Sequence, residues 1–152
     1  MKLKIQKNIL LASLSRIQGI VEKNSIRPIT SNTLIKVLDK KISISATNLQ
    51  IAIKTTCKDV KIEKDGQISV NAKKLFEIIK QLPDKEISIE EKENFHINIF
   101  SGKTHVEMIG TPPEDFPDFM EEEKEDYLNR LEFIYILKVL ADQSELRENG
   151  HS

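Results

Sequence analysis

The chain of 152 residues has the length of one domain with a single hydrophobic core. Hydrophobic residues make up 39% of it and charged residues 31%, which excludes a disordered chain and a chain embedded in a membrane. The net charge of −1 excludes a uniformly basic nucleic-acid binder but permits a local positive face.

The first half of the chain predicts a strand, a helix and three further strands. The apolar positions of the helix recur at steps of four, three and four residues: Leu10, Leu14, Ile17 and Val21. That spacing is typical of an amphipathic helix. In the last strand, Leu49, Ile51 and Ile53 alternate with more polar residues, which indicates one buried face. The expected elements are a strand over 2–6, a helix over 7–23, a loop over 24–32, strands over 34–38 and 42–45, a hairpin turn at 46–48 and a strand over 49–54.

The second half of the chain predicts the same order again. After a turn at 64–66 we expect a strand over 67–71, a helix over 72–82 that stops at Pro83, and strands over 87–90, 95–100 and 103–109. Ser101 and Gly102 form the turn before the last strand.

The two halves also match residue by residue. At a distance of 65 positions, Ile5 and Leu10 match Val70 and Leu75; at a distance of 55, Ile42, Ile44, Ile51 and Ile53 match Ile97, Ile99, Val106 and Met108. Such self-similarity indicates a duplicated strand-helix-three-strand unit. We therefore predict an α+β fold in which each half supplies one helix and one small antiparallel sheet, with the two helices paired and packed on the sheets.

The chain changes character after residue 110. Residues 111–126, with three prolines and many acidic side chains, are typical of a linker. A helix is expected from Tyr127 to about Gln143, and over 127–141 its apolar residues cover most of the circumference, which is typical of a helix buried on several sides. Its partner is the first domain, another chain or further sequence, and we favour further sequence.

The sequence contains no constellation that indicates catalysis, a metal or a cofactor. The five glycines are scattered and form no phosphate-binding loop. His96 and His105 are expected on strand faces, and His151 lies in the tail, so no metal-ligand spacing occurs. Cys57, the only cysteine, is expected to be an ordinary half-buried thiol in a strand. A non-catalytic protein without cofactors is predicted, and an enzyme finds no support.

Two observations bear on location. No apolar run approaches the roughly 20 residues of a membrane-spanning helix. Charged and apolar residues alternate from the first residues onward, unlike a signal peptide. We expect a cytoplasmic protein.

Charge is unevenly distributed along the chain. Acidic residues are concentrated in 114–126, whereas Lys73, Lys74 and Lys80 share one predicted helix. By themselves, both clusters are best interpreted as ordinary solvated surface.

The duplicated order, with basic residues on the second helix, resembles domain one of the bacterial DNA polymerase III beta subunit, the beta sliding clamp family. Matching segments follow the family order at near-constant spacing over about residues 1–120: Met1-Lys2-Leu3-Lys4-Ile5, Arg27-Pro28-Ile29, Ala46-Thr47-Asn48-Leu49, Lys73 to Ile78 through Leu82-Pro83, Ser101-Gly102-Lys103, and Glu114-Asp115-Phe116-Pro117. In this family three such domains form a subunit, and two subunits close head to tail into a ring, with helices lining the hole and sheets outside.

The resemblance implies a processivity factor that encircles double-stranded DNA without sequence preference and tethers the replicative polymerase to it. Its implied partners are DNA, other clamp subunits in a homodimeric ring, the polymerase and the clamp loader. The residues expected to face the hole are Arg16, Lys23, Arg27, Lys73 and Lys80, with plain surface charge as the alternative. The family's subunit interface maps onto Lys74, Ile78, Lys103, His105, Val106 and Met108, with completion of the domain core as the alternative for the apolar ones.

The sequence departs from the family in several places. Asn48 stands where the family usually has Asp, and Arg27 stands where it usually has an apolar residue. Residues 1–120 correspond to the N-terminal domain, and 121–152 to a linker and the first helix of an incomplete second domain. We therefore expect a truncated clamp subunit that alone neither closes the usual ring nor presents the pocket for polymerase and loader peptides. A stand-alone clamp-like module that binds a full-length clamp, or self-associates, is the alternative hypothesis.

Overall fold

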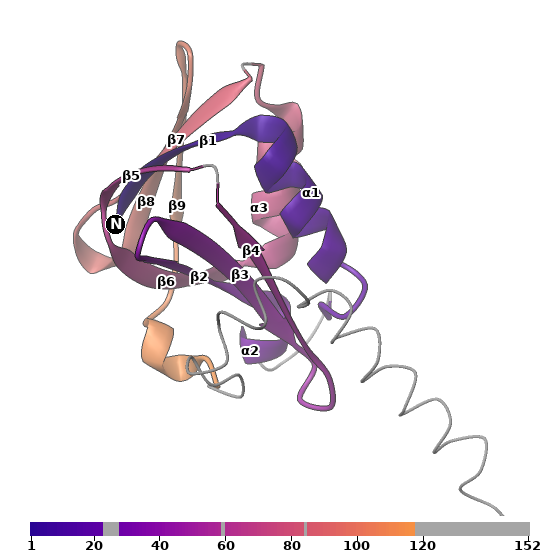
Figure 1. The fold of residues 1–152 in the computed structure, drawn as a ribbon. Coiled ribbons are helices and arrows are strands. Elements are labelled where there is room, and N and C mark those ends of the chain that lie inside the picture. Colours follow the sequence, from indigo (N-terminus) through magenta and orange to yellow (C-terminus); the bar gives the residue numbers. More distant parts are fainter. Residues whose placement is uncertain (23–27, 59, 84, 118–152) are drawn as a thin grey trace, which may run out of the picture.

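The structure is a computed structural model that describes residues 1–22, 28–58, 60–83 and 85–117 (Figure 1). The candidate residues Lys23 and Arg27 lie outside the described residues, as do the acidic part of the expected linker, the expected final helix and the expected second-domain segment 121–152.

The described elements repeat a strand-helix-three-strand order, with β5 inserted between the two halves. They are β1 (Lys2–Gln6), α1 (Lys7–Ile17), α2 (Pro28–Ser31), β2 (Asn32–Leu38), β3 (Lys41–Thr47), β4 (Ala52–Cys57), β5 (Lys61–Lys64), β6 (Gly66–Asn71), α3 (Ala72–Gln81), β7 (Glu86–Glu91), β8 (His96–Ser101) and β9 (Thr104–Ile109), with short 3-10 helices η1 (Glu93–Phe95) and η2 (Pro113–Asp115). The predicted duplication and the α+β class are confirmed.

The strands form two antiparallel sheets that exchange their first strands between the halves. The sheet orders are β5-β1-β7-β8-β9 and β4-β3-β2-β6. Leu3 of β1 pairs with Ile89 of β7, and Ile68 of β6 pairs with Ile35 of β2. The expectation that each half forms its own sheet is therefore wrong. Each first strand instead adds to the three-stranded meander of the other half, so the exchange ties the halves into one core.

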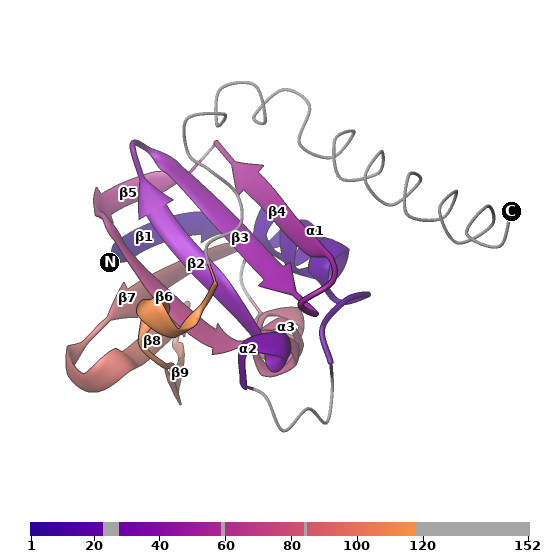
Figure 2. The same cartoon turned by 90° about the horizontal axis from the view of Figure 1, so that it is seen from below.

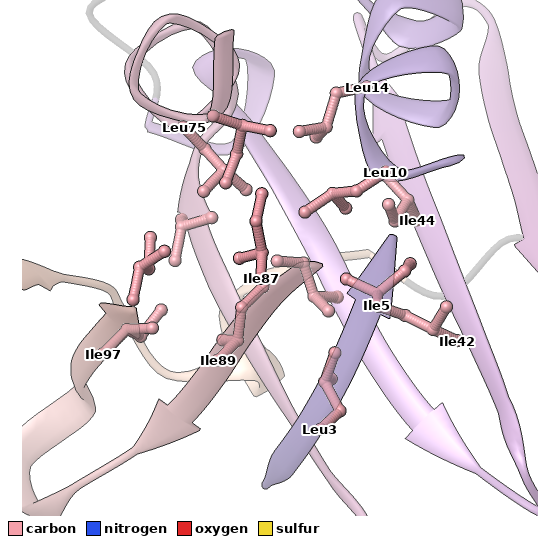
Figure 3. Packing of buried hydrophobic residues seen from close by; sticks show 14 of the residues in the cluster. Leu3, Ile5, Leu10, Leu14, Ile42, Ile44, Leu75, Ile87, Ile89 and Ile97 are labelled. Atoms are coloured by element: carbon pink, nitrogen blue, oxygen red, sulfur yellow. The ribbon is translucent and has the colours of Figure 1, made fainter. Parts of the chain in front are cut away.

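The core lies between the two helices and the inner faces of both sheets (Figure 3). The matched apolar pairs are at most 2% exposed: Ile5 and Val70, Leu10 and Leu75, Ile42 and Ile97, Ile44 and Ile99. Burial of each such side chain contributes roughly 1.5–3 kcal/mol relative to leaving it exposed. The repeat in the sequence is thus a repeat of core positions.

Helices α1 and α3 run antiparallel, side by side (Figure 1). The Lys7 ammonium at the start of α1 donates to the carbonyl oxygens of Lys80, at 3.1 Å, and Leu82, at 2.6 Å, at the end of α3. Gln18, just past the end of α1, donates to the carbonyl oxygen of Ala72 at 3.5 Å. These contacts fix which helix faces point away from the sheets.

Helix α1 is shorter than predicted, because it ends at Ile17 rather than continuing to residue 23. The amide group of Gln18 donates to the carbonyl oxygen of Leu14 at 3.0 Å, and Gly19 follows in a turn. Side-chain capping therefore ends the helix before the apolar stripe is complete. Val21 still packs against the core, but outside the helix.

The β3–β4 hairpin also differs from the prediction, because β3 continues to Thr47 and the loop covers 48–51. The Asn48 side chain accepts hydrogen bonds from the backbone N–H groups of Gln50 and Ile51, at 2.9 and 2.8 Å. Leu49 has a φ of 74° and is 50% exposed. Local capping by Asn48 outweighs the apolar alternation, so the strand predicted from residue 49 begins only at Ala52.

Residues 111–117 are packed on the domain, contrary to the linker expected there. Thr111 bridges to Ser69 of β6 through backbone hydrogen bonds of 2.7 and 3.3 Å. Phe116, just after η2, is buried. Figure 2 shows η2, in orange, beside β6.

Candidate functional site

The exposed side of α3 carries the basic residues singled out in the sequence. The helix starts at Asn71, whose side-chain oxygen accepts a hydrogen bond from the backbone N–H of Lys74 at 2.9 Å. Leu75 and Ile79 are buried against the core, so the helical period turns Lys73, Lys74 and Lys80 toward solvent. Glu77 is the one acidic residue of α3, and α1 contains none.

Arg16 extends this basic face onto α1. Its guanidinium donates to the Thr55 hydroxyl of β4 at 3.2 Å, which holds the side chain beside the edge of the four-stranded sheet. The Lys80 ammonium lies 5.4 Å from the ring centroid of Phe76, within cation–π range. We define Arg16, Lys73, Lys74 and Lys80 as the basic helix face. Within the described residues, none of its three lysines takes part in an ion pair.

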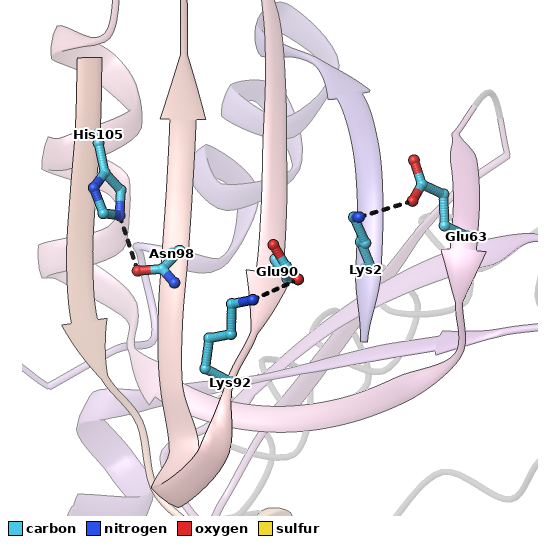
Figure 4. A network of polar contacts seen from close by, with 6 residues as sticks. All are labelled: Lys2, Glu63, Glu90, Lys92, Asn98 and His105. Atoms are coloured by element: carbon cyan, nitrogen blue, oxygen red, sulfur yellow. Dashed lines mark hydrogen bonds and ion pairs between the residues drawn. The ribbon is translucent and has the colours of Figure 1, made fainter. Parts of the chain in front are cut away.

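The outer face of the five-stranded sheet has a different electrostatic character (Figure 4). Lys2 pairs with Glu63 at 3.2 Å, and Lys92 pairs with Glu90 at 2.9 Å. The hydrogen bond from Lys92 holds the pKa of Glu90 below its ordinary value. Lysines on this face are thus partly neutralised by carboxylates, whereas those of the basic helix face point to solvent.

The six residues predicted for a subunit interface divide into three groups. Val106 and Met108 are half-buried on the inner side of β9, the edge strand of the five-stranded sheet, where they pair with Ile99 and Ile97. His105 points to the outer side, with its ring stacked on Phe100 at a centroid distance of 4.6 Å.

The other three lie apart from that strand. Lys103 is exposed in the β8–β9 turn, Ile78 is half-buried on α3, and Lys74 is exposed on α3. Val106, Met108 and Ile78 all pack against the core cluster. Ile109, which the sequence did not single out, is 67% exposed at the end of β9.

The two described histidines and the cysteine lie in strands. His96 and His105 are on the same outer face, where His96 Nδ1 lies 2.6 Å from Glu107 Oε1 and His105 Nε2 lies 2.9 Å from Asn98 Oδ1. Cys57 is 6% exposed in β4, more buried than predicted, with its sulfur 2.9 Å from the Ser13 hydroxyl. Within the described residues, no group of three or more His, Cys, Asp or Glu is placed to hold a metal ion. No described helix is long and apolar enough to cross a membrane.

Sequence reasoning missed a shallow hollow next to the basic helix face. It lies between the end of α1 and the start of α3, and it is lined by Gln18, Val21, Lys73, Phe76 and Glu77. The early end of α1 exposes this hollow, and no spacing in the sequence indicated where that end would fall.

A duplicated α+β domain with two helices on one side and two exchanged sheets on the other defines the class of DNA-clamp folds. The chain belongs to the family described as DNA polymerase III beta subunit, N-terminal domain, which matches residues 1–120. The resemblance drawn from the sequence is thereby confirmed.

Known proteins support the same assignment. A beta sliding clamp of Vibrio harveyi is 29% identical over 150 residues, covering 97% of this chain and 94% of that relative. One of Caulobacter vibrioides is 33% identical over 119 residues, covering 77% of this chain and 32% of the relative. A solved DNA polymerase sliding clamp from Caulobacter crescentus superimposes with a TM-score of 0.74 at 31% identity, covering 80% of this chain and 33% of that one. This chain therefore spans about a third of the length of most of these proteins.

Proposed function

We propose that this chain is the N-terminal domain of a DNA-replication sliding clamp, a non-catalytic processivity factor of the cytoplasm. In this proposal residues 1–120 form the domain and residues 121–152 lead into a second one. The observation that carries the proposal is the separation of charge described above: solvent-facing lysines on the helix side, and ion-paired lysines on the outer side of the five-stranded sheet. Membership of the clamp family supports it.

The basic helix face suits the phosphate backbone of duplex DNA. Lysine and arginine side chains on a convex helix pair attract phosphates without reading bases, so the binding is independent of sequence and weakens with salt. A clamp that holds DNA by encircling it needs only this loose attraction. The replicative polymerase and the clamp loader are the proposed partners of the full-length protein.

Charge reversal tests the DNA-facing role directly. Lys73→Glu with Lys80→Glu is compared with Lys4→Glu and Lys64→Glu, a control pair of exposed lysines on the five-stranded sheet with the same change in net charge. Binding to a fluorescently labelled duplex is measured by anisotropy at several salt concentrations.

The helix pair should weaken binding and lower the slope of log K against log salt by up to about 2, since each lost phosphate contact removes roughly 0.9. The control should change the slope much less. Equal effects of the two pairs would contradict the proposed site, because the effect would then follow net charge alone.

We further propose that the β9 edge contacts a neighbouring clamp subunit. An edge strand offers unpaired backbone groups, and Ile109, Val106 and Met108 supply apolar surface beside them. Lys74 on α3 and Lys103 in the β8–β9 turn add exposed positive charge, for an acidic partner.

Sedimentation velocity of the chain mixed with a full-length beta sliding clamp tests this interface. Lys74→Glu with Lys103→Glu should reduce co-sedimentation, while Lys40→Glu with Lys64→Glu, exposed lysines elsewhere, should not. Unchanged co-sedimentation of the first variant would remove these lysines from the interface. Self-association of the chain without the clamp would favour the stand-alone module instead.

A further inference from the structure

The four-stranded sheet contains no acidic residue in any of its strands, β2, β3, β4 or β6. Its inner positions are mostly apolar and buried, so alternation turns the residues between them outward. On that outer side, Lys54 pairs with Ser45, and Ser43 lies between Lys36 and Thr56. We call Lys36, Lys41, Ser43, Ser45, Lys54 and Thr56 the lysine–hydroxyl face.

The five-stranded sheet provides the contrast. Its strands carry Glu63, Glu86, Glu90, Glu91 and Glu107. Several of these carboxylates pair with nearby cations, as Glu63 does with Lys2. Of the two sheets, only the four-stranded one therefore carries an excess of positive charge. We expect an anionic partner to neutralise it.

Lys54 is the residue of this face that most needs an anionic partner. It is only 8% exposed, and it forms no hydrogen bond or ion pair with any residue that the structure describes. A covered ammonium without a counter-charge is costly, so such lysines are normally matched by a carboxylate or another anion.

The last described residues lie beside this sheet, because η2 contacts β6. Thr111 bridges to Ser69, and the same row of the sheet continues through Leu34 and Ser45 to Lys54. Three strand spacings of about 4.8 Å separate β6 from β4. Residue 121 follows residue 117 by four Cα steps, which span at most about 14 Å, and this is about the width of three strand spacings.

We propose that the acidic segment 121–126 of this chain binds the lysine–hydroxyl face. The segment reads Glu121-Glu122-Glu123-Lys124-Glu125-Asp126, five carboxylates against one ammonium. Carboxylates accept hydrogen bonds from both lysines and hydroxyls, the two groups that the face offers. Once bound, the segment neutralises the outer side of the four-stranded sheet and leaves the basic helix face as the surface open to nucleic acid. This inference does not depend on the clamp function.

A charge-swap cycle on the full chain tests the contact. Urea unfolding is measured for three variants. They are Lys54→Glu, the triple change of Glu121, Glu122 and Glu123 to Lys, and the combination of both. The combination should regain stability over the sum of its parts. Because Lys54 is covered, the coupling in the unfolding constant should be at least the roughly twofold to fivefold of exposed ion pairs. The coupling should disappear in 1 M salt. As a matched control, Lys80→Glu combined with the same triple change should be additive. Additive behaviour of Lys54 as well would overturn the proposal.

A second experiment leaves the folded domain unaltered. Glu121, Glu122, Glu123 and Glu125 are changed to Gln, and binding of a fluorescein-labelled single-stranded oligothymidylate is measured. The variant should bind more tightly than the natural chain, and Lys36→Glu with Lys41→Glu should reverse the gain. Absence of a gain, or its reversal by Lys73→Glu and Lys80→Glu alone, would contradict the proposal. Binding of the oligonucleotide to Lys36 and Lys41 in the natural chain would also overturn it, by making the face a nucleic-acid site.

Discussion

The ammonium group of Lys7 lies 2.6 Å from the carbonyl oxygen of Leu82, so the first residue of α1 closes the end of α3. The last carbonyl groups of a helix lack partners within the helix, and a lysine that binds them also interacts favourably with the helix dipole.

Lys7→Met keeps the aliphatic stem but removes this contact and the one to Lys80. We expect a loss of about 1–3 kcal/mol in the free energy of unfolding, the usual cost of leaving a hydrogen-bonding group without its partner. Urea unfolding measures it. Lys4→Met, at an exposed position of β1, is the control and should change stability little. Equal losses for the two variants would mean that Lys7 does not join the helices.

Leu75 anchors the basic helix to the core, because it is 1% exposed under α3. Leu75→Ala should cost about 2–5 kcal/mol in unfolding free energy, since it leaves a cavity between the helix and the sheets. Leu49→Ala removes the same atoms from a side chain that is 50% exposed and should cost far less. Thermal or urea unfolding of the two variants measures both losses of stability. Similar losses would mean that α3 is not packed on the core through Leu75.

The turn between β2 and β3 stores backbone strain. Asp39 and Lys40 have φ angles of 52° and 64°, and the matching Asn94 and Phe95, 55 positions later, have φ angles of 55° and 61°. Two-residue hairpin loops with positive φ at both positions favour glycine at the second. Lys40→Gly should therefore stabilise the protein, by up to about 1 kcal/mol. Lys41→Gly, one residue into β3, should instead destabilise it by roughly 0.5–1 kcal/mol. A loss of stability in both variants would contradict the left-handed turn.

Glu90 should titrate below its ordinary pKa of 4.5, because Lys92 donates a hydrogen bond to its carboxylate and Lys2 lies nearby. A carboxyl group whose pKa is lowered on folding stabilises the fold above its ordinary pKa, and that contribution is lost as the pH falls through the lowered value. Lys92→Met should raise the pKa of Glu90 toward 4.5, as followed by NMR titration. Lys61→Met, which removes the partner of Glu86, should leave the pKa of Glu90 unchanged. No rise in Lys92→Met would exclude the ion pair in solution.

Much of the fold could be predicted because its core positions repeat. The apolar period within each element and the constant offset between the two halves both identify buried pairs such as Ile5 and Val70, or Ile44 and Ile99. The exchange of first strands could not be predicted, since no local pattern says whether β1 pairs with β2 or with β7. Strand β5 was missed because Ile62 is the only apolar residue among Lys61–Lys64.

The candidate site was predictable where helical geometry alone decides it. The spacing of Lys73 and Lys80 around the buried Leu75 and Ile79 places these lysines on the outer side of α3. The hydrogen bond of Arg16 to Thr55 depends on how α1 crosses β4, which the sequence does not encode locally. The DNA-facing and interface roles of all these residues stay predictions.

The central claim is that duplex DNA binds the helix side of this domain. An NMR titration of the isotope-labelled chain with a short duplex, at low salt and again at high salt, tests it most directly. We expect signals of Arg16, Lys73 and Lys80 to shift on addition of DNA and to return as salt rises. Signals of Lys2 and Lys61 in the five-stranded sheet, and of Lys92 just after β7, should stay in place. Shifts confined to the sheet faces, with the helix signals unmoved, would contradict it.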